Sequence, residues 1–395
     1  MGKGTSVKAL IIGGSVAGLA AAHELRAAGV ESEVFERSSG TMQTRGAGVV
    51  MQPEVEALLR GLGFTAESVS VELFERQQLH RTGEATGYAA PQLMTSWDTL
   101  YRTLRDSLPA DSYRLNSTLH QLRTDGNQIR AEFADGSSAV GDFVVGADGI
   151  GSATRKLVNP EARETVYAGY VAWRGLEPEA MLPQDLVDLL SGRFTFYGAN
   201  GLQFLSYLVP GPNGELTQGK RRVNWVWYMN VPEQNLRHLL KGKSGRQYTT
   251  FLPPGELDGD SGIQLAAVAR SMLPPQLGDL VQRLNVFMQP IFDLPATRMS
   301  TGRTALIGDA AGTVRPHTAS GTSKAFGDAR GLAIELQRFM SARPSSLQDR
   351  LGDWERNRHE HLGRLSDVGI ELARRSSLGT TIGSQYLTEP QSLPE

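Results

Sequence analysis

A short apolar run near the start of the chain is followed by glycine and then by a helical pattern of apolar residues. Residues 7–12 form the run, which contains no proline and is typical of a buried strand. Gly13-Gly14-Ser15-Val16-Ala17-Gly18 comes next, and the pattern beyond it predicts a helix that ends at Gly29. Residues 33–35 predict a second strand, which ends at Glu36. This order of elements indicates a βαβ unit.

The glycine turn of this unit matches the dinucleotide fingerprint Gly-x-Gly-x-x-Gly at its first and last positions. Gly13 allows a sharp turn out of the strand, and Gly18 allows the helix to pack closely on it. Ser15 replaces the middle glycine, and its small side chain adds a hydroxyl donor. Glu36 lies 18 residues after Gly18, where a carboxylate can bind ribose hydroxyls. We therefore predict a pyrophosphate at this helix N-terminus; the alternative is a helix start that binds no nucleotide.

Two later apolar runs also lead into a glycine and an acidic residue. Residues 143–145 are followed by Gly146-Ala147-Asp148-Gly149, and residues 304–307 by Gly308-Asp309-Ala310-Ala311. Both runs predict buried strands whose carboxyl ends carry a turn and a carboxylate.

The region between residues 166 and 230 is rich in aromatic residues and predicts an antiparallel sheet. An aromatic sheet face would suit a flat aromatic ligand, whereas an ordinary aromatic core is the alternative. The predicted strands are 171–174, 194–197, 203–209 and 223–230. The predicted helices outside the βαβ unit are 53–62, 96–108, 234–240, 324–340 and 347–375, and Ser96 is the predicted N-cap of the second of them.

The composition is that of an ordinary globular enzyme and excludes several kinds of chemistry. The chain has 395 residues, 40% hydrophobic and 21% charged, which is enough for two domains or one large α/β domain. The absence of cysteine excludes disulfides, thiolate nucleophiles, iron–sulfur clusters and cysteine-ligated zinc. The seven histidines have no metal-ligand spacing, so no metal is expected.

Charge and hydropathy argue against nucleic acid and membranes as partners. The formal net charge of −2 offers no attraction for nucleic acid or an anionic membrane. No apolar run reaches the roughly 18 residues that a membrane-spanning helix needs. We therefore expect a cytoplasmic enzyme.

Together, the three glycine-containing motifs resemble those of the group A flavoprotein aromatic hydroxylases, the class of p-hydroxybenzoate hydroxylase. Residues 146–149 resemble the Asp-Gly motif of that family and residues 308–311 its Gly-Asp motif, in the family's order along the chain. Within the family the chain resembles the 2,6-dihydroxypyridine 3-hydroxylase type. This narrower resemblance rests on residues 13–15, 50–54, 167–175, 308–311 and 315–317.

The resemblance implies an α/β fold: a FAD-binding Rossmann-like domain of the glutathione-reductase type, an inserted mixed or antiparallel β-sheet substrate domain, and C-terminal helices. The implied FAD-binding domain is discontinuous and comprises residues 1–75, 97–162 and 288–340. The other implied parts are the substrate domain at 76–96 and 163–287, a C-terminal helical segment at 341–376 and a loosely ordered tail at 377–395.

The resemblance also implies which residues hold FAD. Ser15, Val16 and Ala17 would contact the pyrophosphate, and Glu36 the adenosine ribose. Helix 324–340 would direct its positive end toward the flavin. The full expected set is Gly13, Ser15, Val16, Ala17, Gly18, Glu36, Arg37, Arg45, Gly48, Leu119, Asp148, Gly308, Asp309, Pro316, Gly321 and Thr322. Two positions depart from the family: Trp97 replaces an arginine that holds FAD in many members, and Gly312 replaces a frequent histidine.

The implied chemistry is hydroxylation of an electron-rich aromatic ring, here a hydroxypyridine such as 2,6-dihydroxypyridine. NADH or NADPH would reduce FAD, and O2 would react through a flavin C4a-hydroperoxide. His317 is the first candidate for a catalytic side chain, because an ordinary histidine pKa near 6.5 suits proton exchange. Tyr207 and Tyr197 are candidate hydrogen-bond partners of the substrate. The expected partners are a small aromatic substrate and O2, with a homodimer as the candidate assembly.

Three alternatives remain open from the sequence. The first is the same chemistry on a hydroxynicotinate, a salicylate-like phenol or a larger natural-product phenol. The second is an NAD-dependent dehydrogenase on a Rossmann fold, against which the two later motifs argue. The third is a flavin-binding redox module that does not hydroxylate.

Overall fold

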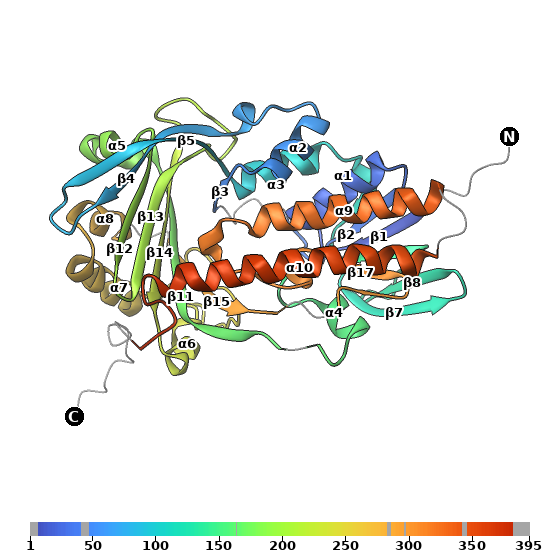
Figure 1. The fold of residues 1–395 in the computed structure, drawn as a ribbon. Coiled ribbons are helices and arrows are strands. Elements are labelled where there is room, and N and C mark those ends of the chain that lie inside the picture. Colours follow the sequence, from blue (N-terminus) through green and yellow to red (C-terminus); the bar gives the residue numbers. More distant parts are fainter. Residues whose placement is uncertain are drawn as a thin grey trace.

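The βαβ unit predicted from the first residues lies at the centre of a mainly parallel sheet, as the computed structural model shows (Figure 1). Strand β1 (Lys8–Ile12) lies between β2 (Glu31–Phe35) and β10 (Phe143–Gly146), and all three are parallel. The strand order is β16-β17-β10-β1-β2-β6. The remaining strands are β6 (Tyr113–Arg114), β16 (Ser300–Thr301) and β17 (Thr304–Leu306). The structure describes residues 7–40, 47–162, 164–282, 286–295, 298–341 and 346–381.

Alternation along β1 directs its side chains to two different layers. Ala9 and Ile11 pack in the cluster formed with a layer of helices, whereas Leu10 and Ile12 pack against a small antiparallel sheet. The helices are α1 (Val16–Ala27), α2 (Pro53–Gly61), α3 (Trp97–Asp106) and α9 (Gly321–Ser341). The small sheet contains β7 (Leu119–Asp125), β8 (Gln128–Phe133) and β9 (Ser138–Gly141). Both faces of β1 are buried, which explains its apolar sequence.

A second, larger sheet forms the other half of the molecule (Figure 1). Its order is β15-β11-β14-β13-β12-β4-β5-β3, and neighbours are antiparallel except for the parallel pair β12 and β4. The strands are β3 (Gly48–Val50), β4 (Val71–Leu79), β5 (Ala85–Ser96), β11 (Val166–Pro178), β12 (Arg193–Ala199), β13 (Leu202–Val209), β14 (Arg222–Asn230) and β15 (Phe287–Asp293).

The two faces of this large sheet both carry aromatic residues but have different surroundings. One face contributes Trp173, Trp225 and Trp227 to a buried apolar cluster with several helices. These helices are α5 (Gln184–Leu190), α6 (Glu233–Leu239), α7 (Gly259–Met272) and α8 (Pro275–Val281). We call the opposite face the cavity face, because it lines the cavity described below. The sequence predicted one aromatic face, and of these four helices it predicted only α6, as residues 234–240.

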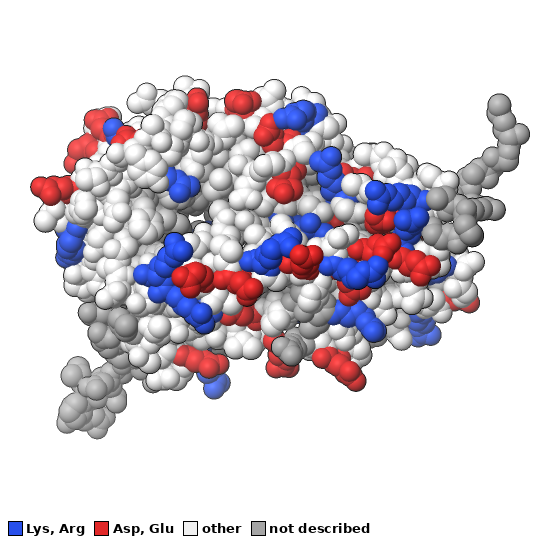
Figure 2. Space-filling view, in the orientation of Figure 1, with Lys and Arg blue, Asp and Glu red and all other residues white. Residues whose placement is uncertain are grey.

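Two long helices connect the parallel sheet to the large sheet. Helices α9 and α10 (Leu347–Arg374) lie side by side across the molecule (Figure 1). Acidic and basic side chains are interspersed along the outer face of α10 (Figure 2), where Arg364 pairs with Glu360 and Arg375 with Glu371. Such a surface is typical of a solvated helix. The remaining helices are α4 (Ala153–Val158) and the short η1 (Glu67–Val69), η2 (Ala110–Ser112), η3 (Glu179–Met181), η4 (Gly308–Ala310) and η5 (Pro316–Thr318).

The predicted fold class is confirmed, with differences in detail. The helix predicted from residue 324 begins at Gly321, and Ser96 is the N-cap of α3, as expected. The predicted domain limits stay a prediction, and the one between residues 75 and 76 falls inside β4. Most of the predicted tail lies outside the described residues. No helix within the described ranges is both long and apolar enough to cross a membrane.

Candidate active site

Three predicted motifs meet at one edge of the parallel sheet. β1, β10 and β17 are adjacent, and residues 13–18, 146–149 and 308–311 follow their carboxyl ends. The N–H of Ala147 donates to the carbonyl oxygen of Ile12 at 2.7 Å, which joins the first two motifs directly. Open α/β sheets bind ligands at this edge. Motifs that are far apart in the sequence therefore form a single site.

The turn after β1 has room for backbone but not for side chains. Gly13 has a φ of +104°, and a Cβ there would lie 2.5 Å from the carbonyl oxygen of Ala147. A Cβ at Gly18 would overlap the carbonyl oxygen of Gly13. Ser15 is the N-cap of α1, and its side chain makes no capping hydrogen bond. The uncapped N–H groups and the Ser15 hydroxyl fit the pyrophosphate of the predicted FAD.

Two carboxylates at this edge are fixed by the protein. Glu36 accepts hydrogen bonds from the N–H of Gly14 at 2.7 Å and the N–H of Ser38 at 2.8 Å. These bonds tie the end of β2 to the glycine turn. Asp148 accepts a hydrogen bond from the Ser152 hydroxyl at 2.5 Å, which orders the loop before α4. A carboxylate has further lone pairs, so both can still accept hydrogen bonds from a dinucleotide.

A buried charged network holds the Gly-Asp turn at the end of β17. Lys324 Nζ donates to the carbonyl oxygen of Gly308 at 2.7 Å and to Asp328 Oδ2 at 3.1 Å. The same Asp328 oxygen accepts the N–H of Gly308 at 3.0 Å, and Oδ1 accepts Arg358 Nε at 2.7 Å. Neither Lys324 nor Arg358 was predicted to have a role at this site. The i, i+4 spacing of Lys324 and Asp328 is the signal that could have found this pair.

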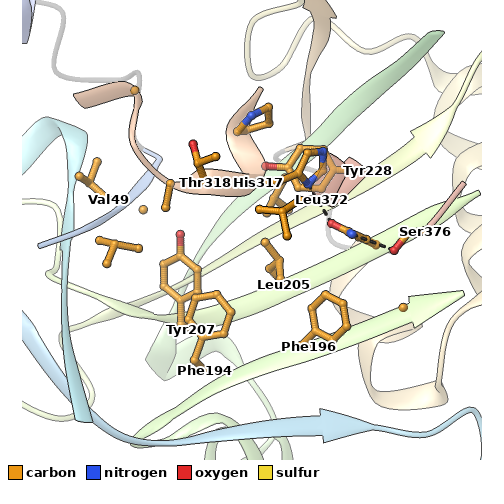
Figure 3. Close-up of a pocket in the computed structure, with 18 of the residues that line it drawn as sticks. Val49, Phe194, Phe196, Leu205, Tyr207, Tyr228, His317, Thr318, Leu372 and Ser376 are labelled. Carbon is orange, nitrogen blue, oxygen red and sulfur yellow. Dashed lines mark hydrogen bonds between the residues drawn. The ribbon is translucent and has the colours of Figure 1, made fainter. Parts of the chain in front are cut away.

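A cavity of about 910 Å³ lies between the cavity face of the large sheet and the segment 314–322. Phe194, Phe196, Leu205 and Tyr207 project from the sheet on one side, while the 314–322 segment bounds the other (Figure 3). This volume is within the range of protein ligand cavities. Of the predicted site residues it is lined by Gly48, Tyr207, Asp309, Pro316, His317, Gly321 and Thr322.

His317 is held in one tautomer. Gln203 Nε2 donates to Ser376 Oγ at 2.8 Å, so Gln203 presents its oxygen to His317 Nδ1 at 2.9 Å (Figure 3). Nδ1 therefore carries the proton, and Nε2 accepts from the Tyr170 hydroxyl at 2.9 Å. Burial, with the nearby Arg315 charge, lowers the pKa of His317 to about 4. These contacts favour a neutral positioning side chain over the proton exchange that an ordinary pKa would allow.

The two candidate tyrosines lie on opposite faces of the large sheet. Tyr207 is on the cavity face and stacks on Phe194 with ring centroids 5.0 Å apart. Tyr197 is on the helix-covered face, where its hydroxyl donates to the carbonyl oxygen of Met272 at 3.2 Å. The structure thus brings Tyr207 and His317 to one cavity and leaves Tyr197 outside it.

The other predicted cofactor residues have varied surroundings. Leu119 is buried in the apolar cluster between the parallel sheet and the small sheet. Arg37 is exposed after β2, and Arg45 lies outside the described residues. Val16 is buried in α1. Ala17 lies close to Gly308, because a Cβ added at Gly308 would be 3.2 Å from the Cβ of Ala17.

Trp97 and Gly312, the two departures from the family pattern, each contact a neighbouring residue in the fold. Trp97 stacks on Tyr101 with ring centroids 5.2 Å apart, so it extends the apolar layer over α3. The N–H of Gly312 donates to the carbonyl oxygen of Gly308 at 3.3 Å and continues the turn after β17.

Comparisons with known proteins agree with this geometry. A family model described as FAD binding domain-like matches residues 167–293. The 2,6-dihydroxypyridine 3-monooxygenase of Paenarthrobacter nicotinovorans is 32% identical over 94% of this chain and 93% of its own length. The solved structure of 2,6-dihydroxypyridine-3-hydroxylase from Arthrobacter nicotinovorans has a TM-score of 0.88 at 30% identity, covering 99% of this chain and 100% of that one. HpxO of Klebsiella pneumoniae, solved with FAD and uric acid, shares the fold at 22% identity, with a TM-score of 0.73 over 96% of this chain and 90% of that one.

Proposed function

The chain belongs to the FAD-dependent aromatic monooxygenases, and from that membership we propose that it hydroxylates a hydroxypyridine, with 2,6-dihydroxypyridine as the first candidate. It is an enzyme that uses FAD, with NADH or NADPH as the family's cosubstrate, which confirms the predicted activity class and cofactors. The observation that carries the substrate proposal is the match along nearly the whole chain to a relative that is named for this reaction. The cavity beside the Gly-Asp turn supports it, because its aromatic face suits a flat ring.

The protein's part in the reaction is binding, orientation and exclusion of water. FAD, when bound, supplies the electron transfer and the activation of O2. We assign its pyrophosphate to the N-terminus of α1 and its reactive ring to the cavity beside Pro316, Gly321 and Thr322. There the positive N-terminal end of α9 would favour negative charge on a bound flavin ring. The stacked Phe194 and Tyr207 orient the substrate ring and keep water from the reacting atoms.

A spectrum of the purified protein, followed by NADH and NADPH oxidation with and without 2,6-dihydroxypyridine, tests this proposal. We expect a flavin spectrum, substrate-stimulated oxidation and a hydroxylated product. Flavin without stimulation would reject the hydroxypyridine and direct the search to the phenols and hydroxynicotinates left open above. No flavin after addition of FAD would contradict the family assignment itself.

Exchange of each candidate tyrosine for phenylalanine separates their roles. Tyr207→Phe is expected to lower kcat/KM by roughly 3- to 10-fold, the effect of one lost neutral hydrogen bond. Among the described residues the Tyr207 hydroxyl has no hydrogen-bond partner, and burial raises its pKa, so it stays a donor at neutral pH. Tyr197→Phe, as the matched control, should change kcat/KM by less than about twofold. Equal losses in steady-state assays would contradict these assignments.

The pH dependence of a His317→Gln variant tests the neutral histidine. Because burial lowers the pKa of His317 to about 4, its ring is uncharged from pH 6 to pH 9. We expect the variant to lose a constant factor of about 3 to 30 in kcat/KM across that range. A wild-type inflection near pH 6.5 that disappears in the variant would instead support proton exchange by this residue.

The proposal also covers where the enzyme acts in the cell and how many copies of the chain assemble. We propose that the enzyme acts in the cytoplasm, where NADH and NADPH are available, and that it forms a homodimer. Sedimentation of the FAD-loaded enzyme at several concentrations would test the assembly, and fractionation of the source cells the location.

A further inference from the structure

Arg174 is a cation on the cavity face of the large sheet that the proposed reaction leaves without a role. Four neighbouring strands place a row of residues in register here. Arg174 of β11 pairs with Val226 of β14. Val226 pairs in turn with Leu205 of β13, and Leu205 with Phe196 of β12. In-register neighbours lie on the same face of a sheet, and all four residues line the cavity. The guanidinium therefore shares this wall with apolar and aromatic side chains.

The guanidinium of Arg174 is half-buried and forms no ion pair with the residues that the structure describes. Within the described residues its Nε is buried without a hydrogen-bond partner, and its side chain takes part in none of the ion pairs. Arg315 and Arg375, close to the cavity, are paired with Asp293 at 2.6 Å and with Glu371 at 3.6 Å. Arg76 also lines the cavity, but its side chain is exposed to solvent and donates to Gln92 Oε1 at 3.2 Å. Leaving a half-buried cation unpaired costs free energy, so such a group commonly has a ligand as its partner.

The groups around Arg174 would also suit an anion. Burial raises the pKa of both Tyr207 and Tyr228, and the nearby Arg174 charge offsets part of this effect. Both hydroxyls are therefore protonated donors at neutral pH. Among the described residues, the charged and titratable groups that face the cavity are Arg76, Arg174, Tyr207, Tyr228, Asp309, His317 and Arg375. Asp309 is the single acid among them and lies on the Gly-Asp turn, away from the sheet.

We propose that Arg174 is a specificity-determining residue that binds an anionic oxygen of the aromatic substrate. The proposal rests on the proposed function and adds that the substrate enters as an anion, a deprotonated ring hydroxyl or a ring carboxylate. A guanidinium offers parallel N–H donors in a plane, so it sets the orientation of the ring as well as its affinity. An oxyanion on the ring also makes the ring more electron-rich, which the hydroxylation requires.

Calorimetric titration of the FAD-loaded enzyme tests this without turnover. The ligands are 2,6-dihydroxypyridine, its neutral analogue 2,6-dimethoxypyridine, and 4-hydroxybenzoate as a carboxylate anion. Arg174→Met is expected to raise the Kd of 2,6-dihydroxypyridine about 10- to 100-fold, and Arg174→Lys less, because charge-assisted hydrogen bonds are lost. The Kd of 2,6-dimethoxypyridine should be the same for wild type and Arg174→Met.

A pH series excludes a merely structural effect. The wild-type Kd should fall as pH rises through the ionisation of 2,6-dihydroxypyridine, and Arg174→Met should flatten this dependence. The matched control is Arg193→Met, which removes an arginine of the same sheet that is already paired with Glu75 at 3.0 Å, outside the cavity. It should change the Kd by less than about twofold. A Kd of Arg174→Met within twofold of wild type, or an equal loss for the neutral analogue, would overturn the proposal.

The ligand panel separates this proposal from the proposed substrate. If the wild type binds 4-hydroxybenzoate but not 2,6-dihydroxypyridine, and Arg174→Met abolishes that binding, the hydroxypyridine proposal fails while the role of Arg174 stands. If neither anion binds the FAD-loaded wild type, the role of Arg174 fails as well. Flavin content and thermal unfolding of each variant confirm that the titrated protein is folded and loaded.

Discussion

Replacement of Asp328 by asparagine is expected to lower the free energy of unfolding by about 3 to 5 kcal/mol, because it leaves a buried cation without its counter-charge. Asp328 accepts hydrogen bonds from Lys324, Arg358 and the N–H of Gly308, and it is 1% exposed. Asparagine has the same shape but only one acceptor oxygen and no charge. The Gly-Asp turn, and with it FAD affinity, should be weakened in the same variant.

Urea unfolding and flavin retention during gel filtration measure the two effects of Asp328→Asn. The matched control is Arg60→Ala, which breaks the exposed i, i+4 pair of Arg60 with Glu56. That pair should contribute less than about 0.5 kcal/mol, and FAD binding should be unchanged. Equal unfolding midpoints for both variants would mean that the buried network does not stabilise the turn.

Replacement of Gly18 by alanine is expected to displace α1 from β1 and to abolish most FAD binding. The added Cβ would overlap the carbonyl oxygen of Gly13, a backbone atom that cannot rotate away, and would lie 3.3 Å from Ile11 Cγ2. Overpacking of this kind costs about 3 kcal/mol. Because α1 would shift, its N-terminus, to which we assign the pyrophosphate, would shift with it and lose its position for binding.

The control for this glycine is Gly61 in the last turn of α2, where an added Cβ would meet nothing within 4 Å. Gly61→Ala should keep FAD and stabilise the protein by up to about 1 kcal/mol, because alanine is the better helix former. Thermal unfolding together with the ratio of flavin to protein absorbance measures both variants. A Gly18→Ala protein that retains stoichiometric FAD would contradict the close packing at this turn.

The first strand, its glycine turn and its helix could be predicted because each depends on neighbouring residues. A continuous apolar run predicts a strand that is buried on both faces, and Gly13 to Gly18 predicts a turn without room for side chains. The same holds for the N-cap at Ser96, whose hydroxyl accepts the N–H of Thr99. Such features need no knowledge of distant segments.

The position of Tyr197 could not be predicted from the residues that neighbour it in the sequence. Alternation places Phe196 and Tyr197 on opposite faces of β12, but both faces of the sheet carry aromatic residues. The sequence therefore could not say which face meets the cavity and which meets the helices. That choice depends on α7 and α8, helices that were not predicted from the sequence.

The sequence by itself determined the fold class, the dinucleotide turn and, through its resemblance to known enzymes, the class of reaction. Only the tertiary structure decided that His317 is neutral, that Asp328 is the centre of a buried network and that Arg174 has no ion-pair partner in the described part of the chain. The physical reason is that a side chain's protonation state and partners depend on groups brought to it from distant segments. Gln203 and Tyr170 reach His317 from two strands of the large sheet, and no local pattern places them there.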